Sequence, residues 1–388
     1  VYLGIDAITD DGKINAKEFA HLSEEDYIKW TKRVTPQYGD IVFSYEATLG
    51  RYALIPKDFY GCLGRRLAII RNVSKDIDTL WLYYYFLSPE WKQFIQSKII
   101  KGSTVNRISV EDFPTYTVPN ISIKVQRKIA NILSKIDEKI ALNNNINDNL
   151  EQQLMLLYDY WFTQFDFPDN DGNPYQTSDG KMVWNDTLKR NIPENWKVQS
   201  IISNCLSSII KPGVEIFNTK TYLATADVKG TSISTGTIVD CDGRESRANM
   251  QPSINSVWFA KMKNSIKHLY LNKEMQPIIS SCILSTGFCG LQCNEISFEY
   301  IASYVSNAYF EIHKDMLAHG ATQEAVNNDD LAGVHIIIPE DTVLRAYHEA
   351  TQPIYAQISK NICENQELVK LRDWLLPMLM NGQTTISD

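Results

Sequence analysis

The stretch VQRKIANILSKIDEKIALNNNINDNLEQQLMLLYDYWF, residues 125–162, decides the fold. Its inward positions alternate in steps of four and three, which is the pattern that packs one helix against another in a coiled coil. No Pro or Gly interrupts the run. At ~1.5 Å per residue the predicted helix is longer than an ordinary domain helix, roughly 55 Å. The inward positions are Ile129, Leu133, Ile136, Ile140, Asn143, Asn147, Leu150, Leu154, Leu157 and Trp161.

The same pattern occurs a second time near the end of the chain, where Asn361 and Asn365 take the places of Asn143 and Asn147. Both central Asn residues thus recur as Asn, although a polar residue in such a seam lowers stability and is usually retained to fix register or partner. Two unrelated amphipathic helices are the alternative interpretation, but they would not share two polar layers at one spacing. The second set is Tyr347, Thr351, Ile354, Ile358, Asn361, Asn365, Leu368, Arg372, Leu375 and Leu379.

The repeat extends beyond the helices into the segments that precede them. Short strand-like runs, an aromatic helical segment over residues 78–99 and a glycine loop all have counterparts in the second half of the chain, at nearly the same offset as the helices. The matched runs are Tyr2-Leu3 with Tyr222-Leu223, Ile41–Phe43 with Val257–Phe259, and Gly102-Ser103-Thr104 with Gly320-Ala321-Thr322. Residues 196–221 have no partner ahead of Val1, so equivalence of the two domains predicts roughly two dozen further residues before it.

The predicted fold is of the α+β class, with two similar mixed α/β domains separated by two long antiparallel coiled-coil helices about a pseudo-two-fold axis. The predicted segments are a first domain at 1–119, a helix at 120–162, a linker at 163–194, a second domain at 195–340, and a second helix with a tail at 341–388. Outside the shared framework the two domains differ greatly, which indicates one kind of module that reads two different things.

The Asn layers predict the register of the two helices. Pairing Asn143 with Asn365 and Asn147 with Asn361 places every amide opposite an amide. A slip by one heptad would bury amides against aliphatic groups at roughly 1–3 kcal/mol each. The same register sets Ile136 opposite Arg372, where we expect the Arg stem along the seam and its head in solvent. It also pairs Ile140 with Leu368, Leu150 with Ile358, Leu154 with Ile354 and Trp161 with Tyr347.

Composition restricts the class of protein. The 388 residues carry a formal net charge of −8, so a nucleic-acid partner would require basic residues that are gathered locally. The seven Cys include no CxxC pair, which favours reduced thiols in a cytoplasmic protein. No apolar run is long enough to span a membrane, and we expect no signal peptide. The acidic run at 166–174 does not fit a calcium loop, because Phe167 and Ser178 occupy ligand positions, so no metal site is predicted.

Motifs of catalysis are absent from the sequence. There is no phosphate-binding GxxxxGK[ST] loop, no GxGxxG fingerprint, no HExxH and no GxSxG elbow. The residues of an amino-methyltransferase site are also missing. His268, His313, His319 and His335 are scattered and read better as surface or hydrogen-bonded side chains than as catalytic bases. We therefore predict a binding protein rather than an enzyme.

Three runs carry a resemblance to a known family: Phe165–Pro168, Gly180–Trp184 and Ile192–Trp196. Together with the two glycine loops, they resemble the central region of specificity subunits of type I restriction-modification systems. Arg345 departs from the family pattern, which would have Gln near that position. The resemblance implies a non-catalytic DNA reader whose two target recognition domains each read half of a split sequence. It also implies that the two helices set the spacing and dock methyltransferase subunits, which bind S-adenosylmethionine, and that restriction/translocase subunits join them. It implies no cofactor in this chain.

Candidate DNA contacts are the basic and polar residues on loops of the two domains, because a protein that grips DNA needs several cations. For any single residue, an ordinary solvated charge is an equally good interpretation. In the first domain they are Arg51, Arg65, Arg66, Lys101, Thr104 and Arg107. In the second they are Lys229, Arg244, Arg247, Lys261, Lys263, Lys267, Thr322 and Gln323. Two alternatives stay open at this point: a two-headed protein-binding scaffold with a coiled-coil spacer, and a cryptic nuclease or methyltransferase.

Overall fold

The computed structural model describes residues 1–382. The chain forms two compact units, one made of residues 1–139 with the C-terminal segment from Val369, the other of residues 140–368. Each unit contains a mixed α/β part together with a stretch of both long helices, α4 (Ile123–Tyr158) and α8 (Asp341–Met380). The two-domain fold with paired long helices is confirmed, but the helices belong to the units rather than forming segments of their own.

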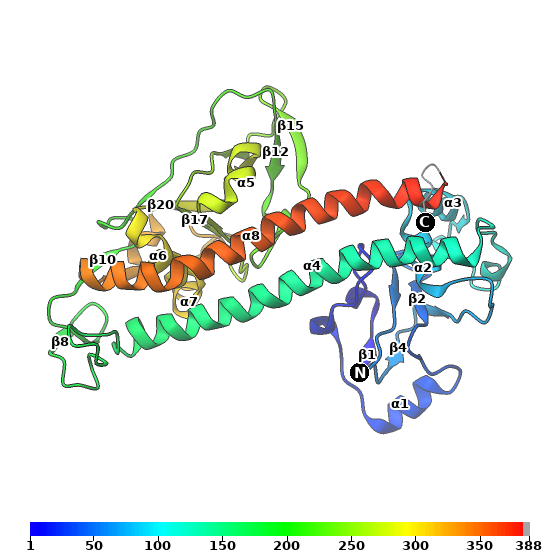
Figure 1. Ribbon diagram of the computed structural model, residues 1–388, viewed down its shortest axis with the longest axis horizontal. Coiled ribbons are helices and arrows are strands. Elements are labelled where there is room, and N and C mark those ends of the chain that lie inside the picture. Colours follow the sequence, from blue (N-terminus) through cyan, green and yellow to red (C-terminus); the bar gives the residue numbers. More distant parts are fainter. Residues whose placement is uncertain (383–388) are drawn as a thin grey trace. The chain divides into compact units, whose positions relative to one another are not determined.

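The first unit is built on a three-stranded antiparallel sheet in the order β3-β2-β5, with a parallel pair of strands, β1 and β4, beside it (Figure 1). Its strands are β1 (Tyr2–Leu3), β2 (Ile41–Ser44), β3 (Tyr52–Leu54), β4 (Cys62–Leu63), β5 (Leu67–Ile70), β6 (Ile99–Ile100) and β7 (Arg107–Ile108). Its shorter helices are α1 (Glu24–Thr31), α2 (Thr79–Leu87) and α3 (Pro89–Ser97).

The aromatic segment at 78–99 forms two helices, where the sequence predicts one. Asp78 caps α2 by accepting a hydrogen bond from the backbone N–H of Trp81, and Ser88 caps α3 through the N–H of Trp91. Pro89 has no N–H to continue the first helix, so it begins the second at a position that suits it. With this break between the helices, Trp81 and Trp91 both pack in one buried aromatic core.

The second unit contains two four-stranded sheets, in the orders β11-β20-β17-β18 and β15-β12-β19-β16. Its strands are β8 (Met182–Asn185), β9 (Arg190–Pro193), β10 (Lys197–Ser200), β11 (Ser207–Ile209), β12 (Thr219–Leu223), β13 (Val228–Lys229), β14 (Ser232–Ile233), β15 (Thr237–Asp240), β16 (Ala248–Met250), β17 (Ser256–Ala260), β18 (His268–Leu271), β19 (Cys282–Ser285), β20 (Phe288–Cys293) and β21 (His335–Ile338). Its shorter helices are α5 (Gln276–Ser281), α6 (Phe298–Ser306) and α7 (Ala308–Leu317).

The internal repeat is visible in the strand pairing. Val42 of β2 pairs with Ala53 and Ile69, and Trp258 of β17 pairs with Leu269 and Gly290 in the same antiparallel arrangement. The parallel pair β1–β4 likewise corresponds to β12–β19. Within the described residues, β5 has no neighbour corresponding to β11, which in the second unit pairs with β20.

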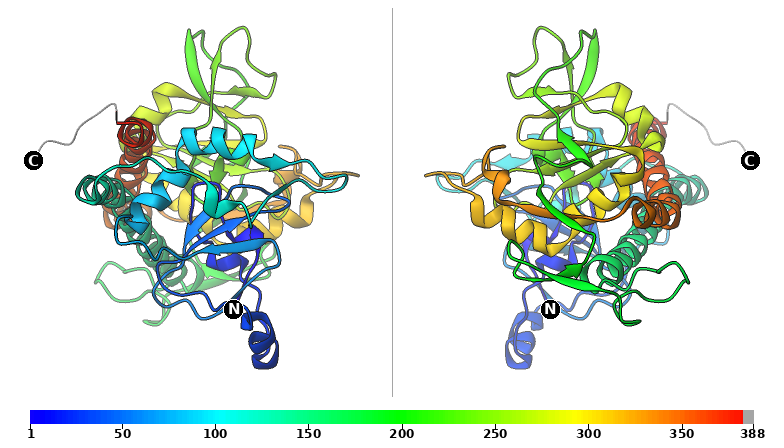
Figure 2. Two further views of the ribbon diagram at one scale, coloured as in Figure 1. Left: turned by 90° about the vertical axis from the view of Figure 1, so that its right-hand side faces the viewer. Right: turned by 90° about the vertical axis from the view of Figure 1, so that its left-hand side faces the viewer.

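In the second unit α4 and α8 pack antiparallel, and Figures 1 and 2 show them side by side. The side-chain amide of Asn143 donates to Asn365 at 3.0 Å, and that of Asn361 donates to Asn147 at 2.8 Å. The rings of Trp161 and Tyr347 meet at 5.5 Å. This is the register predicted from the paired amides.

A double-mutant cycle tests the amide layers. We expect Asn147→Leu to lower the free energy of unfolding by about 1–3 kcal/mol, because it leaves the buried side-chain N–H donor of Asn361 without its acceptor. The double variant Asn147→Leu/Asn361→Leu should recover most of that loss, since no orphaned polar group remains. Urea unfolding of the single and double variants measures both steps. A double variant less stable than either single variant would contradict the pairing.

The guanidinium of Arg372 does not lie where that register predicted it. Its guanidinium binds Asp137 at 3.0 Å, its side chain is only 14% exposed, and Tyr84 donates to the other Asp137 oxygen at 2.7 Å. The expectation of a head in solvent is therefore wrong. The carboxylate on the facing helix and the Tyr hydroxyl of the domain satisfy the charge inside the structure, which costs less than leaving it unpaired there.

The predicted linker at 163–194 is also more structured than its polar sequence indicates. It contains the β8–β9 hairpin, and its aromatic residues Phe165 and Phe167 pack on Trp196. Only a few large side chains make this packing. The segment's composition does not reveal it, because Asp, Asn and Gly residues dominate there. The segment is part of the core of the second unit.

Candidate nucleic-acid interface

One end of the first sheet gathers the nominated residues of the first unit. Tyr45, directly after β2, accepts from the N–H of Ile108 at 2.8 Å and donates its own N–H to the carbonyl of Arg66 at 3.1 Å. These bonds bring the β2–β3 loop, the β4–β5 turn and the β6–β7 loop together. We call this surface the first edge, and it consists of Arg51, Arg65, Arg66, Lys101, Thr104 and Arg107.

The corresponding end of the second unit has the same construction. Lys261, directly after β17, accepts from the N–H of Val326 at 3.0 Å and donates to the carbonyl of Gly287 at 2.9 Å. Lys267 and Gly230 form a further bridge at this end, and the N–H of Thr286 donates to the carbonyl of Arg247 at 2.8 Å. We call this surface the second edge, and it consists of Lys229, Arg244, Arg247, Lys261, Lys263, Lys267, Thr322 and Gln323.

The same steric constraint explains why glycine occupies the matching position of both loops. A Cβ at Gly102 would lie 2.2 Å from the carbonyl oxygen of Val105, and a Cβ at Gly320 would lie 2.5 Å from that of Gln323. Both distances are far below a van der Waals contact, so only glycine lets the loop close. The loops therefore keep one shape in both units while the side chains around the glycine differ.

Several nominated cations already have partners. Arg51 binds Asp10 at 2.7 Å, and Lys263 binds Glu324 at 2.6 Å. Arg244 donates to the carbonyl of Ala248 at 3.0 Å and Lys267 to that of Thr225 at 2.5 Å. Cations with such partners hold the loops in place. Because they are already paired, they offer less positive charge to a polyanion. Arg65 lies 5.6 Å from the centre of the Trp30 ring, a cation–π contact that holds its side chain in place.

A second set of cations stands out by contrast. Within residues 1–382, no ion pair joins these side chains to a carboxylate, and all except the partly buried Lys261 are exposed. They are Arg66, Lys101 and Arg107 on the first edge, with Lys229, Arg247 and Lys261 on the second edge. Each edge thus combines anchored charges with unneutralised ones, an arrangement that suits contact with phosphates.

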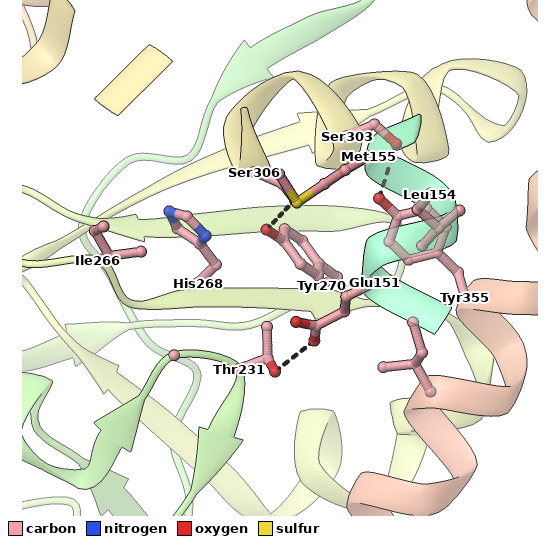
Figure 3. A pocket seen from close by; sticks show the side chains of 12 residues that line it. Glu151, Leu154, Met155, Thr231, Ile266, His268, Tyr270, Ser303, Ser306 and Tyr355 are labelled. Atoms are coloured by element: carbon pink, nitrogen blue, oxygen red, sulfur yellow. Dashed lines mark hydrogen bonds between the residues drawn. The ribbon is translucent and has the colours of Figure 1, made fainter. Parts of the chain in front are cut away.

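A pocket of about 150 Å³ lies beside the second edge and connects it to α4 (Figure 3). The hydroxyl of Thr231, in the β13–β14 turn next to Lys229, donates to Glu151 of α4 at 2.7 Å. Burial raises the pKa of Glu151, and the Thr231 hydroxyl partly offsets that shift. Sequence reasoning missed both residues, because 80 residues separate them and no motif marks either one.

His268, which also lines this pocket, is a hydrogen-bonded core residue. Its Nε2 lies 2.8 Å from Glu311, and Glu311 also accepts from Lys314 at 2.6 Å. The Lys314 ammonium donates to the carbonyl of Ala260 at the end of β17. This buried trio therefore supports the strand that leads into the second edge.

Other kinds of site find little support in the described part of the chain. No group of three or more His, Cys, Asp or Glu side chains there is arranged to hold a metal ion. Within residues 1–382, which contain all seven cysteines, no disulfide is formed. None of the helices in residues 1–382 is long and apolar enough to cross a membrane.

Known proteins are similar in sequence to this chain over part or most of its length. Residues 6–152 match the family model described as type I restriction modification DNA specificity domain. The MjaIX type I restriction enzyme specificity subunit of Methanocaldococcus jannaschii is 23% identical over 95% of this chain and 82% of that protein. The HindI specificity subunit of Haemophilus influenzae is 22% identical over 89% of this chain and 86% of its own length. A solved S subunit of a type I restriction-modification system from M. genitalium covers 99% of this chain and 92% of its own, at 14% identity and a TM-score of 0.48.

The fold and its two equivalent edges define a duplicated binding protein with paired helices. The two relatives and the matched domain all carry the description of type I restriction specificity proteins. The chain is similar over most of its length to specificity subunits of type I restriction-modification systems.

Proposed function

We propose that the chain recognises DNA sequence through its two edges, each of which reads one half of a bipartite target. The observation that carries this proposal is the repeated pair of backbone hydrogen bonds that places basic loops at the same end of both sheets. The shared framework presents loops of different sequence, Lys101–Arg107 in one unit and His319–Ala325 in the other. Different side chains on one framework favour two different half-sites.

Binding to duplex DNA tests this proposal directly. We expect the full chain, assembled with methyltransferase subunits, to bind a target duplex with an affinity that falls steeply with salt, because cations that contact phosphates release counterions. A two-headed protein scaffold would show no sequence-dependent DNA binding under those conditions. Titration of target and scrambled duplexes at several salt concentrations separates the two functions.

The helices are the proposed docking site for methyltransferase subunits. Leu156 on α4 is 71% exposed and Trp374 on α8 is 60% exposed, and the two occupy equivalent positions in the repeat, as Asn143 and Asn361 do. A large apolar side chain exposed at the same position of both copies suits a partner that binds twice. The S-adenosylmethionine would be held by those subunits, and restriction/translocase subunits would join the assembly.

Charge substitutions at these two positions test the docking. We expect Leu156→Lys to remove one methyltransferase subunit from the complex and Trp374→Lys to remove the other, because a buried lysine would be desolvated without a partner. Native mass spectrometry counts the bound subunits. The exposed Gln153 on α4 provides the control variant Gln153→Lys, which should bind both. Loss of both subunits from either single variant would contradict two equivalent sites.

The chain itself is proposed to be non-catalytic. The sequence has none of the motifs of phosphate, zinc or nucleophilic chemistry, and the relatives are specificity subunits. We expect the purified chain, given S-adenosylmethionine and target duplex, neither to methylate nor to cut it. Transfer of a labelled methyl group without a partner subunit would establish the rival function, a cryptic methyltransferase.

A further inference from the structure

A cavity of about 310 Å³ lies in the second unit where α4 gives way to a π-helical turn, Asp159–Thr163. Single π turns inside α-helices are frequent at functional sites. The cavity is lined by this turn, the β8–β9 hairpin, the α6–α7 junction and β21. Four aromatic side chains form much of its wall: Tyr158, Phe162, Tyr304 and Tyr309. The space and the walls suit one large aromatic side chain.

Arg190 gives the cavity an uncompensated charge. Its guanidinium donates to the carbonyl of Thr163 at 2.6 Å and lies 4.6 Å from the centre of the Phe165 ring. Burial lowers the pKa of Arg190, and no carboxylate among the described residues forms an ion pair with it. Asp159, on the same wall, is already bound to Asn307 and Thr163. A half-buried guanidinium in this state is complementary to a carboxylate from outside.

The rim of the cavity is apolar and extends beyond the space itself. Met155 and Tyr309 line the cavity and are about two-fifths exposed, while Ile312 and Met316 continue the same face of α7 and are 57% and 75% exposed. Such a face is wider than a small molecule would need. Contiguous exposed apolar surface marks a contact with another protein.

The first unit provides an internal comparison for this face. The capping residues Ser88 and Asn307 begin α3 and α7 at equivalent positions of the repeat. Counted from these caps, the apolar residues of α7 correspond to polar residues of α3: Tyr309 to Glu90, Ile312 to Gln93 and Met316 to Ser97. The β8–β9 hairpin that supplies Arg190 belongs to the connector and is likewise found once. The surface is therefore not shared by the two copies, unlike the positions of Leu156 and Trp374.

We propose that this cavity is the docking site of a protein segment that inserts one aromatic side chain and pairs a neighbouring carboxylate with Arg190. The segment comes from a partner that binds once per chain. This site is distinct from the two edges proposed to read DNA. It is also distinct from the repeated positions at which a methyltransferase subunit is proposed to dock.

Site-specific photo-cross-linking in cells tests the site. A benzophenone amino acid replaces Met316 in the full chain, and the same replacement at Ser97 is the matched control. We expect one adduct at position 316 and none at position 97. Mass spectrometry of the cross-linked peptide should show an aromatic residue within a few positions of Asp or Glu. In a chain that also carries Arg190→Gln, the yield should fall at least tenfold, because the charge-assisted bond is lost.

Several results would overturn the proposal. They are equal or no cross-linking at the two positions, an adduct with a second copy of this chain, a peptide without a carboxylate, and a yield indifferent to Arg190→Gln. A second variant, Tyr309→Ser, alters a partly exposed wall residue and should lower the yield even if Arg190→Gln disturbs folding, which thermal unfolding checks. All variants should keep native DNA binding, so failure of this site and failure of DNA recognition are distinguishable.

Discussion

A chain in which Arg66 and Arg107 are both replaced by glutamine will bind its target duplex on the order of 10–100-fold more weakly at ~0.1 M salt. Both side chains are exposed on the first edge, and neither forms an ion pair with a carboxylate in the described residues. If each contacts one phosphate, the slope of log affinity against log salt should become shallower by about 0.9 for each lost contact. Fluorescence anisotropy at four or more salt concentrations measures both quantities.

Lys57 and Lys75 provide the control for this variant. Both follow strand ends at the opposite end of the sheet, where Ile55 bonds to the carbonyl of Asp40 and β5 ends at Ile70. The variant Lys57→Gln/Lys75→Gln removes the same amount of charge from the same unit. Its affinity and salt slope should stay near the native values. Equal losses for the two double variants would show that net charge, rather than the first edge, controls binding.

The variant Lys314→Met will lower the stability of the second unit by about 3–5 kcal/mol, because it breaks a buried ion pair by removing one partner. The Lys314 side chain is 0% exposed, and its ammonium lies 2.6 Å from Glu311. Counted from the caps of α3 and α7, the first unit has Ile95 at the equivalent position, so the framework accepts an apolar residue there. The expected loss therefore comes from the charge left on Glu311.

A second substitution separates charge from packing at this position. The double variant Glu311→Leu/Lys314→Met leaves neither charge and should recover most of the lost stability, since a buried ion pair is often no better than apolar packing. Chemical unfolding followed by tryptophan fluorescence compares the three proteins. A double variant less stable than Lys314→Met would show that the charged trio itself stabilises the unit.

Acid should unfold the second unit partly through Glu311. Burial raises the pKa of this carboxyl, but the hydrogen bonds from His268 and Lys314 outweigh burial and lower it overall. A carboxyl with a lowered pKa in the folded state contributes stability above its unfolded pKa and loses it as the pH falls through the folded pKa. In Lys314→Met, the hydrogen bond from Lys314 no longer lowers the pKa of Glu311. The loss of stability on acidification should therefore begin at a higher pH.

The helix pairing could be predicted because it rests on a periodic pattern. A buried amide requires a hydrogen-bond partner, so pairing the two Asn layers favours one register, and the bonds Asn143–Asn365 and Asn147–Asn361 follow it. Arg372 shows the limit of the pattern. Its partner Asp137 does not belong to the seam, and the third member of the network, Tyr84, comes from a different part of the fold.

The edges could be predicted as a set of loops but not in their electrostatic state. The repeat places the loop of Thr104 and that of Thr322 at equivalent positions, and it therefore predicts DNA contacts among the basic residues close to these loops. The partners that neutralise them are distant in sequence. Asp10 lies 41 residues from Arg51, and Glu324 lies 61 residues from Lys263. No local pattern reveals which cations remain available to DNA, since tertiary folding decides that.

A domain exchange followed by sequence selection tests most directly whether each unit reads its own half of the target. The native chain and a chain with Val1–Pro119 replaced by the equivalent domain of another specificity subunit are each assembled with methyltransferase subunits. Each complex then selects duplexes from a random pool, and the bound sequences are read. The native chain should select two short sequences at a fixed spacing, and the exchange should change one of them and leave the other intact. A single contiguous sequence, or a change in both halves, would contradict two independent reading edges.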